Sequence, residues 1–391
     1  MKNKNYQKEN ERKRITGCIL LAAGFALLAA SRISHTFAQW YSTHIYPLWV
    51  ESIGRIAGIL PFSLSELLLY VLLLWIIFTT AIRINRLVRR KEEREKLKSW
   101  LWSLFLAAAA LFFLYQLNCG VNYYRESFSE SSGIHLYEYS AAELEETCQW
   151  LTDEVNALCG GVERDNRGVM THASDTGERA VRAMQELGSI YTGLEGYYPE
   201  PKGLLASWIL AVQNLSGIYS PFTIEANYNS TMADYNIPFT MCHELSHLRG
   251  FMQEQEANFI AFLACISSDD QEFRYSGNLM GWIYCMNVLR RVDYDAWETI
   301  RVQLSQEAES DLQANREYWS KYDGAIAEVS NKINDTYLKA NGQTEGVKSY
   351  NRMVDLIVNW GRGNFNFPPS PIGFPPVHLQ MKCLQIHFFV S

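Results

Sequence analysis

The chain has 391 residues, of which 48% are hydrophobic and 13% aromatic, enough to form the cores of more than one domain and too apolar for a disordered protein. The net charge is -7, with lysine and arginine concentrated in the first hundred residues and an acidic remainder, which argues against nucleic acid as a partner. Eight cysteines without CxxC pairs indicate neither a cysteine-rich zinc module nor a dense disulfide framework, and they leave the redox state open.

Three apolar stretches predict membrane-spanning helices at residues 15–31, 64–82 and 100–117. Each is close to the roughly 20 residues needed to cross a hydrocarbon core of about 30 Å. Ser63 and Glu66 form the S-x-x-E pattern of a capping box at the start of the second stretch. The alternative for the first stretch is a cleaved signal peptide, but the spans that follow favour a membrane anchor at residues 1–118.

The basic residues predict how this anchor is oriented. They gather before the first span and between the second and third, which places both segments in the cytoplasm. The loop at residues 33–62 carries little positive charge and many aromatic residues, so we expect it on the outer face. Everything after Asn118 is then extracytoplasmic, in a multi-pass protein of the cell membrane. The basic residues are Lys2, Lys4, Lys8, Arg12, Lys13, Arg14, Arg83, Arg86, Arg89, Arg90, Lys91, Arg94, Lys96 and Lys98.

From Cys119 onward the pattern is amphipathic and interrupted, as in a water-soluble domain, and helix signals dominate it. One persuasive strand is expected in "PFTIEANYN", residues 221–229. After Trp360 the sequence becomes rich in Pro, Gly and Phe, so we expect a domain at residues 119–360 and an irregular tail at 361–391. The expected helices cover residues 140–158, where Ser140 and Glu143 form a capping box, and 175–187, 276–292 and 294–333.

The motif "HELSH" suggests metal chemistry. In a helix, His243 and His247 lie one turn apart on the same face, so both can bind one zinc ion. Glu244 then borders the metal-bound water, whose pKa zinc lowers from about 15.7 towards ~7, and can accept its proton. This is the H-E-x-x-H arrangement of zinc peptidases. The alternative is an exposed amphipathic helix that happens to carry two histidines.

The context of the motif favours the metal site. Pro238 suits the first turn of a helix, Gly250 suits its end, and an acidic helix follows at once to offer a third ligand. The strand at residues 221–229 precedes the motif, where a zincin-type cleft needs an extended edge for a peptide, although an ordinary core strand fits equally well. The next apolar run, residues 257–266, is too short to span a bilayer, which disfavours an intramembrane protease.

Three stretches carry a resemblance to a known family: "WYSTHIYPLWVESIGRIAGILPFSLSELLLY", "PFTMCHELSHLRGFMQEQEANFIAFLA" and "NDTYLKANGQTEGVKSYNRMVDLI". With them the chain resembles an uncharacterised bacterial membrane family, the domain of unknown function DUF3810, which is assigned to the zincin-like metallopeptidases. The resemblance implies a mainly α protein with a helical, zincin-like α+β domain after the membrane helices. By analogy with other zincins, His243, His247 and Glu256 are zinc ligands and Glu244 is the catalytic acid and base.

Helix geometry allows only one of Glu254 and Glu256 to be a ligand. Residues two apart point about 200° away from each other in a helix of about 3.6 residues per turn. Helical steps from Glu256 reach Ile260, Leu263 and Ala264, an apolar line expected to face the core, and the steps from Glu254 are less apolar. Together with the resemblance, this favours Glu256.

In the third stretch, Tyr350 and Arg352 are types that stabilise an oxyanion or hold a carboxylate. Packing and surface roles are favoured for both, so neither is taken as a site residue.

The first hypothesis for function is a membrane-anchored zinc metallopeptidase that hydrolyses peptide bonds in proteins or cell-wall peptides. The alternative is a non-catalytic metal-binding sensor or scaffold, and Glu244 discriminates between them because a structural site needs no base. A transporter is a weaker alternative, since the spans lack the charges that mark transport paths.

Overall fold

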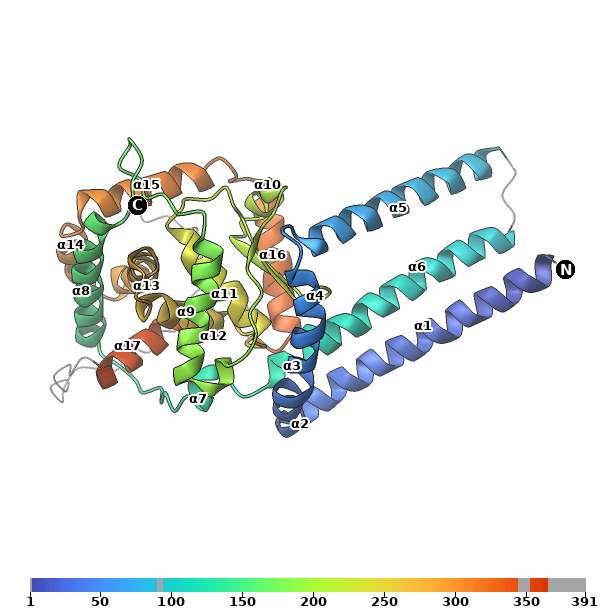
Figure 1. Ribbon diagram of the computed structural model, residues 1–391, viewed down its shortest axis with the longest axis horizontal. Helices are drawn as coiled ribbons and strands as arrows, with labels where there is room; N and C mark the ends of the chain where they lie inside the picture. Colours follow the sequence, from blue (N-terminus) through green and yellow to red (C-terminus); the bar gives the residue numbers. More distant parts are fainter. Residues whose placement is uncertain (1, 90–93, 344–351, 365–391) are drawn as a thin grey trace. The chain divides into compact units, whose positions relative to one another are not determined.

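The computed structural model describes residues 2–89, 94–343 and 352–364. The chain is mainly helical with one small sheet (Figure 1). It divides into two compact units: residues up to Arg125 together with Ser220–Glu225, and the remainder. We describe each unit separately.

The first unit is built on three long helices. Three segments in it are long and apolar enough to cross a membrane, Tyr6–Ile33, Leu64–Val88 and Arg94–Tyr124, and each contains one of the predicted spans. This is compatible with membrane association. The connection expected as an outer loop is itself largely helical. The helices are α1 (Lys2–Ile33), α2 (His35–Trp40), α3 (Tyr46–Trp49), α4 (Arg55–Gly58), α5 (Leu64–Val88) and α6 (Arg94–Tyr115), with π-helical turns at Tyr41–Ile45, Val50–Gly54 and Gln116–Gly120 and a 3-10 turn at Val121–Tyr124.

Two glycines let α1 and α6 approach each other closely. A Cβ atom at Gly17 would lie 2.4 Å from the ring of Phe105, and one at Gly24 would lie 2.7 Å from the ring of Phe112. The absent side chains therefore leave room for aromatic rings of α6. Close packing of this kind through small residues is typical of helices that associate in membranes.

The N-terminus of α5 confirms half of the predicted capping box. The Ser63 hydroxyl accepts a hydrogen bond from the amide of Glu66 at 3.1 Å. Glu66 does not complete the box, since its carboxylate accepts from the Tyr70 hydroxyl at 2.5 Å. The remaining free amides of the first turn are bound by the buried carboxylate of Glu225, which explains why this short segment belongs to the first unit.

The second unit is a helical bundle in which α11, α12 and α13 pack against one another. Gly277 and Gly281 let α13 approach α12, since added Cβ atoms would lie 2.5 Å from Cys265 and 2.7 Å from Phe262. The predicted helix at 140–158 is confirmed, with the full capping box at its start. The helices are α7 (Phe128–Ser131), α8 (Ala141–Leu158), α9 (Thr176–Ile190), α10 (Ser207–Val212), α11 (Asn236–Leu248), α12 (Glu254–Ile266), α13 (Gln271–Val292), α14 (Tyr294–Arg301), α15 (Gln306–Trp319), α16 (Ala325–Ala340) and α17 (Arg352–Asn364).

The sheet contains more than the one expected strand. The segment at 221–229 forms a strand only at β3 (Glu225–Tyr228), which lies between β1 (Lys202–Gly203) and β2 (Gly217–Ser220). β1 runs parallel to β3. The two outer strands are very short, which explains why they leave little pattern in the sequence.

Two expectations about the later helices are wrong in their boundaries. The single helical segment expected at residues 294–333 is three helices, α14 to α16. The Ser305 hydroxyl caps a new helix at the amide of Ala308, and the chain leaves the helical conformation again after Trp319, with extended backbone at Gly324 before α16. α17 continues to Asn364, past the expected start of the tail at residue 361. The rest of the predicted tail, residues 365–391, lies outside the described residues, as does Tyr350.

Candidate metal centre

The two motif histidines lie on α11, as the sequence predicts. Pro238 stands in the first turn of this helix, and Gly250 ends it with a φ of +88°. The Gly250 amide donates to the carbonyl of His247 at 2.8 Å, and the next amide donates to the carbonyl of Ser246 at 3.2 Å. These bonds form a Schellman motif, which favours glycine because of its left-handed residue. The turn reverses the chain directly after His247.

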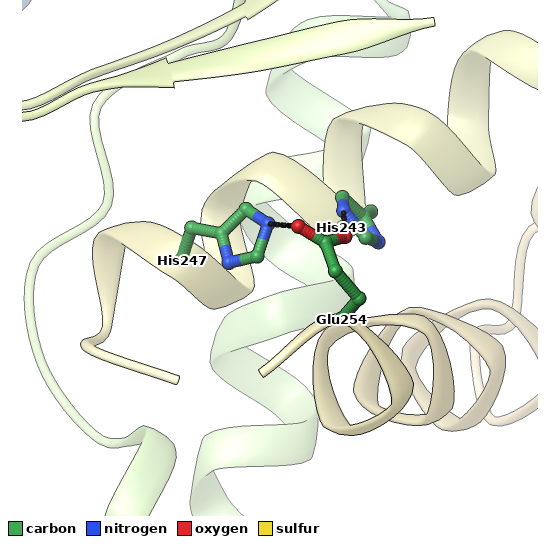
Figure 2. A group of neighbouring side chains, drawn as sticks. All are labelled: His243, His247 and Glu254. Carbon is green, nitrogen blue, oxygen red and sulfur yellow. Dashed lines mark ion pairs between the residues drawn. The ribbon is translucent and has the colours of Figure 1, made fainter. Parts of the chain in front are cut away.

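Glu254, the first residue of α12, meets both histidines (Figure 2). Its carboxylate lies 3.3 Å from Nε2 of His243 and 3.8 Å from Nε2 of His247. One ligand atom from each of the three residues falls within 4.8 Å of the others. All three side chains are at least 86% buried, with exposed fractions of 12%, 10% and 14%.

The turn after α11 also orients the ring of His247. Its Nδ1 lies 2.8 Å from the carbonyl oxygen of Phe251. A carbonyl only accepts, so the proton of the neutral ring is on Nδ1 and the lone pair of Nε2 points to Glu254. Burial lowers the pKa of His247 to about 4, which keeps this ring neutral. Such a hydrogen bond from the distal nitrogen is typical of histidines that bind metals.

The pKa of His243 is shifted in the opposite direction to that of His247. Burial lowers its pKa, but Glu254, Glu244 and Asn258 together outweigh burial and the net shift is upward. The Asn258 side chain, one helical turn after Glu254, also interacts with His243 and with the buried hydroxyl of Tyr284 on α13. Asn258 and Tyr284 are therefore outer partners of the cluster, and the sequence analysis did not identify them. An asparagine one turn after a candidate ligand on the same helix face was the available signal.

Glu244 lies beside the cluster on α11, buried to 4% exposure. Burial raises its pKa to about 8, with the nearby His243 lowering it and Glu254 raising it. Its carboxylate occupies the space that Gly217 of β2 leaves open, since a Cβ atom there would lie 2.4 Å from Oε1 of Glu244. Its other oxygen, Oε2, has no hydrogen-bond partner among the described residues.

The structure does not bring Glu256 to the histidines. Its carboxylate accepts hydrogen bonds from the amide and the hydroxyl of Ser129, both at 2.9 Å, in the first turn of α7. Helix geometry does allow only one of the two glutamates to face His243, but the apolar line chosen to decide between them was a poor criterion. Nearly every residue of α12 is buried, so the helix has no single inward face. We therefore replace Glu256 with Glu254 in the candidate ligand set.

The donor set fits a zinc ion. Two imidazole nitrogens and one carboxylate are a ligand set of catalytic zinc sites, in which a fourth position is left to water. The carboxylate of Glu254 is buried, and at least one of the two rings beside it, that of His247, is neutral and does not balance its charge. A bound cation would therefore stabilise the cluster.

Comparison with known proteins identifies a family. No curated protein and no solved structure matches the chain. Residues 41–358, which are most of the chain and include His243, His247 and Glu254, match the model of a protein family of unknown function. The chain therefore belongs to the DUF3810 family.

Proposed function

We propose that this protein is a membrane-anchored zinc metallopeptidase that hydrolyses peptide bonds at the outer face of a bacterial membrane. The observation that carries the proposal is the buried cluster of His243, His247 and Glu254, with Glu244 next to it on the same helix. His243, His247 and Glu254 would hold the metal. A zinc ion in this position polarises a water molecule and lowers its pKa towards ~7.

Glu244 serves as the general base and acid in this proposal. It stands between the two histidine ligands in sequence, and Oε2 is free to accept a proton from the attacking water. The same carboxyl then delivers that proton to the leaving amine. Burial raises the pKa of Glu244 in the metal-free chain, and a bound cation would lower it, which would favour the carboxylate that accepts the proton of the water.

One outer contact orients a ligand, because the carbonyl of Phe251 fixes the tautomer of His247. Asn258 lies close to His243, whose Nδ1 has no hydrogen-bond partner among the described residues. Prior orientation of ligands by such contacts typically contributes 10- to 100-fold in metal affinity or activity, as an order-of-magnitude guide.

The test of the proposed chemistry is Glu244→Gln in the purified full chain. Glutamine cannot accept a proton, but the three ligands are unchanged, so we expect zinc content equal to wild type and loss of hydrolysis of a quenched fluorescent peptide library. Glu200→Gln, a glutamate of the same domain outside the cluster, is the matched control and should retain activity. Zinc binding without hydrolysis in the wild-type protein would instead favour the metal-binding sensor or scaffold.

The membrane part of the proposal has a separate test. The three apolar segments, with basic residues before the first and between the second and third, support a cytoplasmic N-terminus and an extracytoplasmic second unit. Protease added to intact, wall-stripped cells should then cut the chain after Asn118. Resistance of the chain until lysis, while a surface control protein is cut, would contradict this orientation.

A further inference from the structure

Helix α16 of the second unit carries a row of exposed apolar side chains. Ile326, Val329, Ile333 and Tyr337 are exposed to 62%, 55%, 64% and 38%. At about 100° per residue, they fall within a stripe of roughly 80° on one side of the helix. Single exposed apolar residues are ordinary, but a continuous row along a helix marks a surface that contacts something apolar.

The charged residues of α16 lie on another side of the helix. Glu328, Lys332, Asp335 and Lys339 fall within an arc of about 60° whose centre is roughly 130° around the helix from the centre of the apolar stripe. Lys339 pairs with Asp335 at 2.5 Å. Two acids and two bases leave this side with no net charge. The helix thus separates apolar and charged side chains although little of it is covered by protein.

The second unit covers a different edge of α16. Within the helix only Ala327 and Leu338 are buried, at 8% and 0% exposure. Both lie about 100–120° around the helix from Ile326. The contact with the rest of the unit therefore does not use the apolar stripe, and the amphipathic pattern has another cause.

A bilayer is the apolar surface that this chain keeps nearby. The last candidate membrane span ends at Tyr124, and the second unit begins at Glu126. With so short a connection, an anchored chain holds the second unit at the membrane surface. An amphipathic helix of this pattern binds there with its apolar side buried about 5–10 Å into the boundary of headgroups and acyl chains.

We propose that α16 is an interfacial helix, with Ile326, Val329 and Ile333 inserted at the surface of the bilayer and Tyr337 at its polar edge. The inference rests on the membrane anchoring proposed above, and not on peptidase activity. Insertion would fix the orientation of the second unit to the membrane. The candidate metal centre would then meet substrates at a set height above the lipid.

The experiment uses the full chain in nanodiscs of phosphatidylcholine and phosphatidylglycerol. A bimane probe is attached to Val329→Cys or to Glu328→Cys, an exposed position about 140° around the helix from the centre of the apolar stripe. The exposed Cys18 and also Cys383 are replaced by serine, and the remaining cysteines are buried. Lipids brominated in the upper acyl chain should quench the probe at position 329 strongly and the probe at position 328 weakly.

Two further variants complete the design. The pair Ile326→Gln and Ile333→Gln preserves helix propensity but removes apolar area, so it should reduce quenching at position 329. Val302→Gln, at an isolated residue with 78% exposure outside α16, should leave it unchanged.

A third probe separates the two proposals. Bimane at Ile77→Cys in α5 reports on anchoring, because this side chain is 64% exposed in a candidate span. Quenching at 77 with equal, weak quenching at 329 and 328 would overturn the interfacial helix while anchoring stands. Because position 77 lies about 20 Å along α5 from Leu64, this probe is tested with lipids brominated deep in the acyl chain, and no quenching there would overturn both. An apolar environment at position 329 without quenching by bromine would also overturn the interfacial helix. If that signal depends on protein concentration, a second copy of the chain covers the stripe. If it does not, another segment of the same chain covers it.

Discussion

The assignment of the third ligand yields the sharpest prediction, because two neighbouring glutamates have different surroundings. In Glu254→Gln, the carboxylate beside His243 and His247 becomes a neutral amide. The zinc-free protein then no longer has to bury this charge, so its stability should stay near wild type. Loss of a ligand should weaken zinc binding by more than the roughly 10- to 100-fold that follows loss of an outer partner.

Glu256→Gln should have the opposite signature. The amide has one accepting oxygen in place of two, and the carboxylate of Glu256 now accepts two bonds of 2.9 Å from Ser129. Losing a buried bond to a charged group costs about 1.5–3 kcal/mol, and this loss should be present with or without zinc. Zinc affinity should be unchanged.

The assay is denaturant unfolding of the full chain in detergent, with and without zinc, together with the zinc content of the folded protein. At free zinc about 100 times the dissociation constant, wild type and Glu256→Gln should each gain about 2.7 kcal/mol from the metal. Glu254→Gln should gain much less at the same zinc concentration. If zinc no longer stabilises Glu256→Gln but still stabilises Glu254→Gln, the assignment of Glu254 as the third ligand is wrong.

Two other predictions concern the surroundings of the site and the pH dependence of stability. Gly217→Ala places a Cβ 2.4 Å from Oε1 of Glu244 and 2.9 Å from a backbone oxygen, at a strain of about 1–3 kcal/mol. The substitution should displace the proposed base and lower peptidase turnover, with zinc content unchanged. Normal turnover would contradict the placement of Glu244. The ion pair between Nδ1 of His172 and the carboxylate of Asp234, at 2.9 Å, raises the pKa of His172 despite opposing burial and a nearby arginine. Because the pKa of His172 is higher in the folded than in the unfolded chain, the contact contributes its full stabilisation below the unfolded pKa of about 6.5. This stabilisation is lost as the pH rises through the pKa of the folded protein. Asp234→Asn should therefore cost more stability at pH 6 than at pH 9 in parallel urea titrations, and an equal or larger cost at pH 9 would refute this.

Local patterns were enough to predict the elements that depend on neighbouring residues. The long apolar runs, the capping box at Ser140 and the glycine stop at Gly250 each express a preference within one turn of chain. The spacing of His243 and His247 likewise predicted that both rings share a helix face, as Figure 2 shows. In these cases the interacting groups are close in sequence, so tertiary packing had little to decide.

Tertiary structure decided the third ligand and the surroundings of the base. Glu254 and Glu256 differ in role because Ser129, far away in sequence, binds one of them, while the turn at Gly250 presents the other to the histidines. Sequence periodicity did not separate them, since α12 is buried on nearly all sides. The proximity of Gly217 to Glu244 is equally invisible in the sequence, because it joins β2 and α11 through space. The physical reason is the same in each case: the energy of a buried carboxylate depends on which distant donors reach it, and only the folded chain brings those donors together.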